Sequence, residues 1–363
     1  MDHAATKPAT RGGPPAPSGP VVSQEARQPL WRRLLYSDLF VLLLTLIVVL
    51  ALLPFANGLL SPGNLLNVAS NFWPLLLIVI GQTFVLIAGG IDLSQTAILA
   101  FTSVFGAMLM TTAANPALYA KSPFWGILFN ENGGVLGSGA GVAVAWGVMM
   151  ALGALIGLLN GFAVSRVGMP PFMVTLTTTL FITAFTVWST KSENVLNLPP
   201  AYTALATSWI AAPIAVVVAV IAHVVLSRSV YGHWLYATGI NARTAEVSGI
   251  PVRRVILMAY VLSGVFTALG AALYTARLGA GRPTLGANLL MDVIGAAVIG
   301  GVSLMGGRGR ITGAALGVLF FVVLTNGLNL MGLEFYTIMW VKGLVILSAV
   351  GIDTVRSRLE ARS

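Results

Sequence analysis

The segment YGHWLYATGINARTAEVSGIPVRR, residues 231–254, decides how this chain folds, because it is the longest internal stretch that could not enter a lipid bilayer. Its ionisable side chains are His233, Arg243, Glu246, Arg253 and Arg254. Apolar sequence lies on both sides of it. A charged surface in this setting is either an ordinary solvated loop or a docking surface for a water-soluble partner.

The composition around this segment is that of an integral membrane protein. Hydrophobic residues make up 57% of the chain and charged residues only 9%, whereas soluble domains carry about 25% charged residues. A spanning helix needs roughly 20 apolar residues, so the 363 residues have room for about ten spans. We therefore predict an all-α, polytopic membrane protein without a separate soluble domain.

The apolar segments divide the chain into an ordered series of predicted helices. They cover residues 37–56, 72–90, 92–112, 140–164, 171–190, 208–227, 255–276, 289–306, 311–331 and 336–352. The second and third are separated by so little that they could form one interrupted or re-entrant element. The membrane domain is expected over 35–353, with a Pro-, Gly- and Ser-rich disordered tail at 1–34 and a second tail at 354–363.

The distribution of basic residues predicts the orientation in the membrane. If the amino terminus is cytoplasmic, the outer connections hold only Lys121, Lys191, Arg277 and Arg282. The inner side then holds Arg27, Arg32, Arg33, Arg166, Arg228, Arg243, Arg253, Arg254, Arg308, Arg310, Arg356, Arg358 and Arg362. This excess places both termini and the 231–254 loop in the cytoplasm. It also accounts for the net charge of +9 without nucleic acid as a partner.

Two longer outer connections, 113–139 and 191–207, are rich in aromatic residues and proline. Such loops serve as anchors at the membrane interface, or as a platform for a partner outside the cell membrane. The sequence leaves both interpretations open.

Several kinds of chemistry are excluded by what the chain lacks. No lysine lies in a Gly-x-x-x-x-Gly-Lys context, so no phosphate-binding loop for ATP is present. The chain contains no cysteine, and no two of its histidines share helical spacing with a carboxylate. We expect no catalytic residue, no metal site and no cofactor bound by this chain.

Four ionisable residues fall within or beside the predicted spans: Asp92, Asp292, Lys342 and His223. An ion-coupled carrier usually has acidic groups at mid-membrane. Asp92 and Asp292 fall near span ends instead, where a solvated carboxylate or a helix N-cap is the more ordinary explanation. The sequence thus argues against a carrier with its own energy source.

Uncharged polar residues recur along the spans and could line a passage for a polyhydroxylated solute. The candidate path residues are Gln82, Asp92, Ser94, Gln95, Asn160, Thr175, Thr178 and Asn326. Residues of these types also hold membrane helices together, and for any single position helix packing is the better explanation.

The ordered motifs resemble the permease subunits of bacterial ATP-binding-cassette importers for simple sugars: the ribose, xylose, arabinose and galactose permease family. The matching stretches are GGIDLS at 89–94, GLLNGFAVSRVGMPPFMVTLTTTL at 157–180, YGHWLYATGINARTAEVSGIPVRRV at 231–255, AYVLSGVFTALGAAL at 259–273, DVIGAAVIGGVSLMGGRGRITGAALG at 292–317 and TNGLNLMG at 325–332. They extend in order over about residues 35–353.

This resemblance implies an importer of a monosaccharide or similar polyol in the bacterial inner membrane. It implies two paired permease subunits (a homodimer or close paralogues), cytoplasmic ATPase subunits that use ATP and Mg, and a periplasmic sugar-binding protein. Residues 241–250 look like the helix that couples to the ATPase. The implied coupling residues are Asn241, Arg243, Ala245, Glu246, Ser248, Gly249 and Ile250.

The chain departs from the family pattern at two places. Thr244 replaces an alanine of the coupling pattern, and Gln95 and Thr96 follow GGIDLS where the family commonly has Val-Gly. The alternatives left open are a branched-chain amino acid permease of the same importer type, an ion-coupled secondary transporter, and a structural membrane protein.

Overall fold

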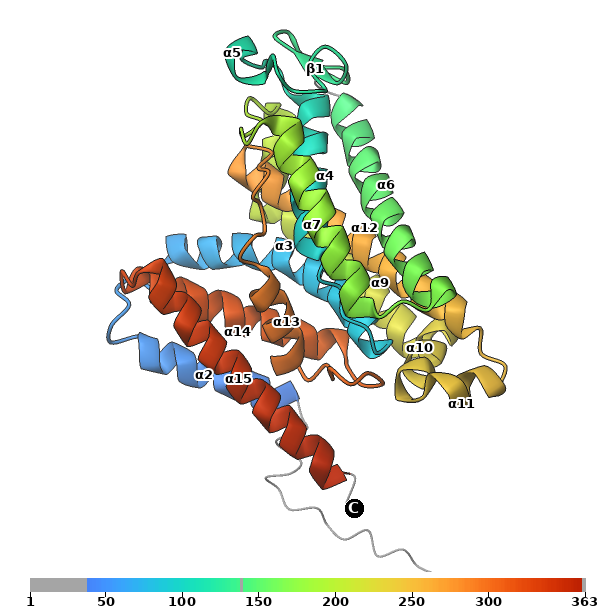
Figure 1. The fold of residues 1–363 in the computed structure, drawn as a ribbon. Coiled ribbons are helices and arrows are strands. Elements are labelled where there is room, and N and C mark those ends of the chain that lie inside the picture. Colours follow the sequence, from blue (N-terminus) through green and yellow to red (C-terminus); the bar gives the residue numbers. More distant parts are fainter. Residues whose placement is uncertain (1–37, 138–139, 361–363) are drawn as a thin grey trace, which may run out of the picture.

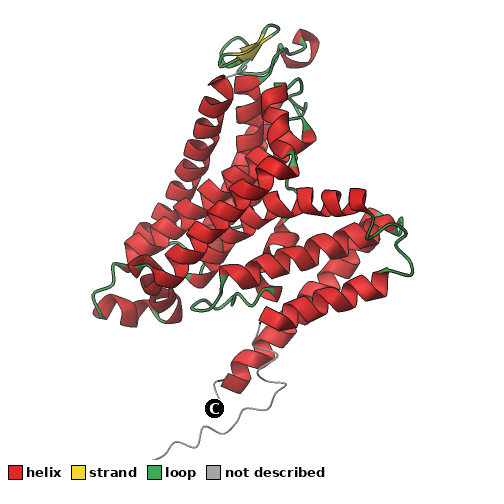
Figure 2. Ribbon diagram, turned by 180° about the vertical axis from the view of Figure 1, so that it is seen from behind, coloured by secondary structure: helices red, strands yellow, loops and turns green. Residues whose placement is uncertain are grey.

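The computed structural model describes residues 38–137 and 140–360, and they are mostly helical (Figures 1 and 2). The predicted tail at 1–34 lies outside this range. The helices are α2 (Asp38–Leu52), α3 (Pro62–Ile87), α4 (Gln95–Met110), α5 (Pro116–Tyr119), α6 (Ala140–Phe162), α7 (Pro171–Thr190), α8 (Pro200–Thr203), α9 (Ser208–Arg228), α10 (Val230–Ile240), α11 (Ala242–Val247), α12 (Val252–Leu278), α13 (Leu290–Ile299), α14 (Ile311–Leu330) and α15 (Phe335–Glu360). A π-helical turn, Ala163–Val167, continues α6, and a 3₁₀ turn covers Ala204–Ala206.

Each predicted apolar segment coincides with one of these helices. Among the described residues, six helices are long and apolar enough to cross a membrane: α3, α6 with its π turn, α7, α9, α12 and α14. The apolar helices α2, α4, α13 and α15 are shorter in their apolar part. The predicted all-α membrane architecture is therefore confirmed in its helical character. The last helix, α15, continues to Glu360, beyond residue 352, where the last span was expected to end.

The second and third apolar segments form two separate helices. α3 ends at Ile87, and Gly89 adopts a left-handed φ of +83° before α4 starts at Gln95. The motif GGIDLS at 89–94 is therefore the non-helical connection between them. Position 90 is occupied by glycine because a Cβ there would lie 2.6 Å from the hydroxyl oxygen of Tyr260.

Glycine spacing on α6 explains its close packing against α12. Gly153, Gly157 and Gly161 recur every four residues and therefore lie along one face of the helix. A Cβ at Gly153 would collide with the carbonyl oxygen of Gly264 on α12, and one at Gly157 with that of Tyr260. Small residues let two membrane helices approach until their backbones touch, so α6 packs directly against the backbone of α12.

One end of the bundle carries an organised cap built from the two long connections. Thr112 donates its backbone N–H to the carbonyl of Asn197 over 2.8 Å, and Ser122 Oγ donates to the carbonyl of Ser189 over 2.6 Å. Tyr119 donates to the carbonyl of Asn194, and burial together with the charge of Glu193 raises the pKa of Tyr119 to about 12. Its hydroxyl therefore stays a donor at neutral pH.

A two-stranded hairpin in this cap is the only sheet within the described residues. β1 (Phe129–Asn130) pairs antiparallel with β2 (Gly133–Gly134). The Asn130 side chain accepts the backbone N–H of Asn132 over 2.8 Å, which closes the turn locally. Short polar-turn chemistry of this kind gives no apolar periodicity, so the sequence did not predict it.

Candidate functional site

The polar segment 231–254 folds into two short helices, α10 and α11, at the end of the bundle opposite the cap (Figure 1). Asn241 separates them with an extended backbone (φ −157°, ψ 102°). Its side-chain oxygen accepts the backbone N–H of Thr244 over 3.0 Å. Asn241 is thus the N-cap of α11, a role for which asparagine is strongly preferred.

The other end of α11 is closed by its own backbone. Ile250 donates its N–H to the carbonyl of Ala245, and Gly249 donates to that of Glu246, each over 3.0 Å. Gly249 has a φ of +83°, the left-handed conformation that this Schellman arrangement requires at the residue after the cap. Of the predicted coupling residues, Asn241, Gly249 and Ile250 therefore define the ends of α11.

The exposed side of α11 combines charge with an apolar residue. Arg243 and Glu246 are exposed, while Ala245 is buried against the bundle. Val247 is 86% exposed, and Ile240, just before α11, is 75% exposed. These two apolar side chains were not predicted as contact residues, although each interrupts a polar stretch of the sequence.

The helix α10 contacts the bundle through backbone atoms. A Cβ at Gly239 would collide with the carbonyl oxygen of Ile87 at the end of α3 and would lie 2.5 Å from the backbone nitrogen of Gly307. Tyr236 donates its hydroxyl to the carbonyl of Gly309 over 2.6 Å. The polar helix pair is therefore fixed directly to the end of α3 and to the loop between α13 and α14.

A buried hydrogen-bond network surrounds Asp92, just beyond the end of α3. Ser94 donates to one carboxylate oxygen through its backbone N–H (3.0 Å) and its hydroxyl (2.6 Å). Ser263 on α12 donates its hydroxyl to the other oxygen over 2.7 Å. Asp92 is fully buried, and the N-cap of α4 is Ser94, so our expectation of a solvated carboxylate or a helix N-cap is wrong for Asp92. Three donors replace the solvent.

Further side chains extend this network by donating hydrogen bonds to the residues that bond Asp92. Thr178 donates to Asn160 (2.6 Å), which donates to Ser94 (2.8 Å). From the other side, the Gln95 amide donates to Ser263 over 2.9 Å. The network thus links the predicted path residues of α4, α6 and α7 to Ser263, which was not among the residues predicted from the sequence.

The remaining candidate path residues, Gln82, Thr175 and Asn326, make no hydrogen bond to the side chains of this network among the described residues. Thr175 donates to the backbone of its own helix and of Ile91. Gln82 is buried in α3, and neither of its amide atoms has a hydrogen-bond partner among the described residues. Asn326 is separate from the network and exchanges two side-chain bonds with Asn64, of 2.7 and 2.9 Å. The structure therefore brings five of the candidate residues together in one network and leaves Asn326 apart from it. The five are Asp92, Ser94, Gln95, Asn160 and Thr178.

A polar cavity of about 350 Å³ lies between α3, α12, α13 and α14. Its polar lining consists of Asn67, Asn71, Tyr274, Arg277, Asp292, Thr325, Asn326 and Asn329. Arg277 donates to Asn71 and, over 2.8 Å, to Asn67. Asp292 pairs through one oxygen with Lys342 on α15 over 2.9 Å. The sequence could have indicated this polar wall, because Asn67 and Asn71 are four residues apart and therefore lie on the same face of α3.

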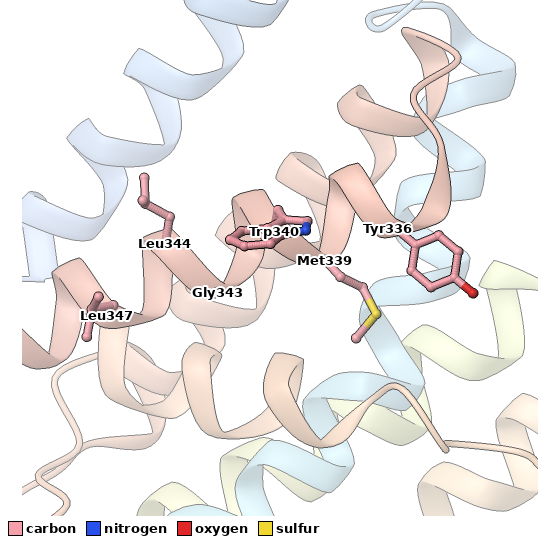
Figure 3. Close-up of a pocket in the computed structure, with 6 residues that line it drawn as sticks. All are labelled: Tyr336, Met339, Trp340, Gly343, Leu344 and Leu347. Atoms are coloured by element: carbon pink, nitrogen blue, oxygen red, sulfur yellow. The ribbon is translucent and has the colours of Figure 1, made fainter.

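A second hollow, of about 450 Å³, follows the surface of α15 (Figure 3). It is lined by Tyr336, Met339, Trp340, Gly343, Leu344 and Leu347. This lining is almost entirely apolar and suits lipid or another helix rather than a polar solute. Within 38–137 and 140–360 no group of three His, Asp or Glu side chains is placed to hold a metal ion.

Comparison with known proteins gives a consistent picture. Residues 64–350 match the family model described as "Branched-chain amino acid transport system / permease component". The ribose import permease protein of Bacillus subtilis is 34% identical over 82% of this chain and 87% of its own length. The D-allose transport system permease protein of Escherichia coli is 31% identical over 89% and 92%. The galactose/methyl galactoside import permease protein of Haemophilus influenzae is 29% identical over 87% and 93%. No solved structure matches the chain.

Proposed function

The chain belongs to the branched-chain amino acid transport system / permease component family, and from this premise we propose that it is the permease subunit of an ATP-binding-cassette importer for a monosaccharide or similar polyol. The observation that carries this function is the similarity, over most of the chain, to permeases for ribose, allose and galactose. A branched-chain amino acid substrate is not favoured, because these relatives are sugar permeases.

The protein is a multi-pass protein of the inner membrane. We propose that its ten apolar helices all cross the bilayer, the shorter ones as tilted or partial spans, with both termini in the cytoplasm. Five arginines lie at the end of the bundle that carries α10 and α11, which supports this orientation. They are Arg166, Arg228, Arg243, Arg308 and Arg310. The cap formed by residues 111–135 and 189–199 then faces the periplasm, where a sugar-binding protein would dock.

The energy source lies in separate subunits. Two permease subunits pair, and cytoplasmic ATPases that bind ATP and Mg dock against α11. Its exposed Arg243, Glu246 and Val247 offer a charged rim around an apolar contact, which is the usual composition of a protein interface. Closure of the ATPases displaces α11, and the contact of Gly239 with Ile87 carries that displacement to α3 and the break before α4.

The buried network around Asp92 supports this importer over an ion-coupled carrier. Such a carrier was left open by the sequence, and Asp92 and Asp292 are indeed both buried. However, both Asp92 oxygens already accept hydrogen bonds, and Asp292 is paired with Lys342. Neither arrangement offers an empty cation site. Sugar uptake by vesicles that hold only this chain, driven by an ion gradient and indifferent to ATP, would overturn the importer proposal.

The coupling role of α11 is tested with two matched glycine substitutions in the reconstituted importer. Gly249 and Gly126 both have φ near +80°, and neither has a heavy atom within 4 Å of the position that a Cβ would take, but they lie at opposite ends of the bundle. Replacing either by valine imposes similar strain, about 1 kcal/mol. We expect Gly249→Val to abolish sugar-stimulated ATP hydrolysis and Gly126→Val to preserve it. Equal stimulation in both variants would exclude α11 as the coupling element.

A further inference from the structure

We propose that the polar cavity between α3, α12, α13 and α14 is a binding site for the transported monosaccharide within a single permease subunit, with Asn71, Arg277 and Asp292 as its main hydrogen-bonding groups. This inference rests on the proposed function and names where that function holds its solute. The cavity volume of about 350 Å³ is at the lower end of the range of about 300–1,000 Å³ typical of small-molecule sites.

The chemistry of the cavity lining matches that of a sugar. Amide side chains both donate and accept hydrogen bonds, a carboxylate accepts and a guanidinium donates. A sugar hydroxyl does both, so a wall with Asn67, Asn71 and Asn329 beside Arg277 and Asp292 can satisfy several hydroxyls at once. Such polar groups are costly inside a membrane protein unless they pair or have a function.

The cavity also holds unsatisfied acceptors. Asp292 is only 6% exposed, and while its Oδ2 accepts from Lys342, its Oδ1 has no hydrogen-bond partner within the described residues. Thr325 Oγ1, on the α14 wall of the same cavity, is also buried without one. A buried polar atom of this kind is destabilising unless a donor reaches it. Both atoms have almost no accessible surface, so a sugar hydroxyl would reach them only after the cavity lining moves.

The charge balance of the lining favours a neutral sugar over an amino acid. An amino acid needs a negative partner for its ammonium group and a positive one for its carboxylate. The negative charge of Asp292 is already balanced by Lys342, so no free anion lies opposite Arg277 on the lining. A neutral solute requires no such charge pair, and Arg277 is held in place by Asn67 and Asn71 as a hydrogen-bond donor.

The position of the cavity agrees with a site reached from the periplasm. Arg277 lies in the last turn of α12, shortly before Gly281, whose backbone pairs with Val195 of the cap. The cavity therefore lies towards the end of the bundle where the sugar-binding protein is proposed to release its cargo. The Asp92 network lies near the opposite, cytoplasmic end of α3.

The test uses cysteine protection, because the natural chain contains no cysteine and an introduced one is its only thiol. Asn329→Cys places a thiol at an exposed position of the cavity wall, and Asn132→Cys places one at an exposed position of the cap. The full chain in lipid nanodiscs is labelled with a maleimide in the presence of D-ribose, D-allose, D-galactose or L-leucine. A sugar at concentration [L] lowers the fraction of empty sites by a factor of 1 + [L]/Kd. At ten times its dissociation constant it should therefore slow labelling of Asn329→Cys by about tenfold. Asn132→Cys should be unaffected.

A matched pair of uptake variants provides the second measurement. Asn71→Ala removes a cavity side chain, whereas the neighbouring Ser70→Ala removes a hydroxyl that bonds only its own helix, to the carbonyl of Leu66. In the reconstituted importer, Asn71→Ala should change the ratio of ribose to galactose uptake, and Ser70→Ala should leave it unchanged. A purely structural role would lower both rates equally.

The outcomes separate this inference from the proposed function. If the reconstituted importer transports a sugar with ATP, yet that sugar neither protects Asn329→Cys nor has its selectivity altered by Asn71→Ala, the cavity proposal is wrong and the importer stands. Protection by L-leucine instead, or failure of Asn329→Cys to react at all, would also overturn the cavity proposal. An absence of ATP-dependent sugar uptake would overturn the function itself.

Discussion

Two buried aspartates of this bundle have opposite surroundings. Asp92 accepts three hydrogen bonds at the turn between α3 and α4, and both of its carboxylate oxygens are used. Asp292 on α13 uses one oxygen for Lys342 and keeps the other unpartnered, within the described residues, beside a cavity of about 350 Å³. The Asp92 carboxylate is fully hydrogen-bonded and holds neighbouring segments together. The Asp292 carboxylate lies in a cavity wall and has one oxygen without a partner within the described residues.

The difference lies in the elements that surround each carboxylate. Asp92 lies in a non-helical turn, where the Ser94 N–H is free to bond it, and α12 approaches closely enough to add Ser263. Asp292 lies in the first turn of the short helix α13, whose neighbours α3 and α14 present amides across an open space. Burial alone therefore does not identify a functional carboxylate. The two carboxylates differ instead in how many of their oxygens are hydrogen-bonded.

The largest expected effect follows from Asp92→Leu. This change leaves three buried donors without an acceptor, and we expect a loss of about 3 kcal/mol or more of folding free energy. Melting of the purified protein, followed by intrinsic tryptophan fluorescence, together with the yield of monodisperse protein, measures it. Asp92→Asn, which keeps one acceptor oxygen, should lose clearly less. If Asp92→Leu melted like the natural protein, the network would not be a fixing element.

The next effect is that of Asp292→Ala. Removing one partner of a buried ion pair is costly because the other charge stays behind, but Lys342 retains 14% exposure, so we expect about 2 kcal/mol. Adding Lys342→Met should restore most of the melting temperature. It should not restore sugar uptake if Asp292 binds solute. If the double variant kept full stability and full sugar uptake, Asp292 would have only a structural role, as Asp92 does.

A smaller effect is expected for Asn326→Leu, at the edge of the cavity. It removes the reciprocal amide pair with Asn64, worth about 1 kcal/mol between membrane helices. Melting of Asn326→Leu, Asn64→Leu and the double variant forms a thermodynamic cycle. Because the two side chains bond each other, the second change should add little to the first, whereas strict additivity would contradict the pairing.

The smallest effect is expected for Gln95→Val, which introduces the residue that the sugar permease pattern commonly has after GGIDLS. Gln95 donates to Ser263 and to the carbonyl of Ile78, but its own carbonyl oxygen is buried without a partner in the described chain. Valine loses the two hydrogen bonds that Gln95 donates, but it also removes the buried carbonyl oxygen that has no partner within the described residues. These two effects nearly cancel, so the change in folding free energy should stay within about 0.5 kcal/mol. Gln95→Ala, which leaves a cavity, is the matched control and should destabilise by about 1 kcal/mol or more.

The sequence predicted the architecture well because lipid imposes strong constraints on composition. Each predicted apolar segment overlaps a helix, and six of these helices, among the described residues, are long and apolar enough to span. The spacing of Gly153, Gly157 and Gly161 would also have predicted the close approach of α6. Its partner, α12, could not have been named, since a stripe of small residues does not specify which helix packs against it.

The candidate site was predicted less completely. The sequence indicated Asn160, Ser94 and Gln95 as a polar set, but Ser263 is 171 positions from its bonding partner Asp92 and only the fold brings them together. In the same way, Asn326 was grouped with these residues, yet it bonds Asn64 beside a different cavity. The helix at 241–250 was expected from the family resemblance, and the structure shows that Asn241 and Gly249 form its ends through local backbone geometry.

The contact of Gly239 with Ile87 and Gly307 has a mechanical consequence. Side chains packed between two moving elements absorb part of a displacement by changing their rotamers. Here main-chain atoms touch main-chain atoms, so nothing compressible separates α10 from the end of α3. In the coupling proposed above, a small displacement of α11 by the ATPases would therefore reach the α3–α4 turn with little loss at this joint.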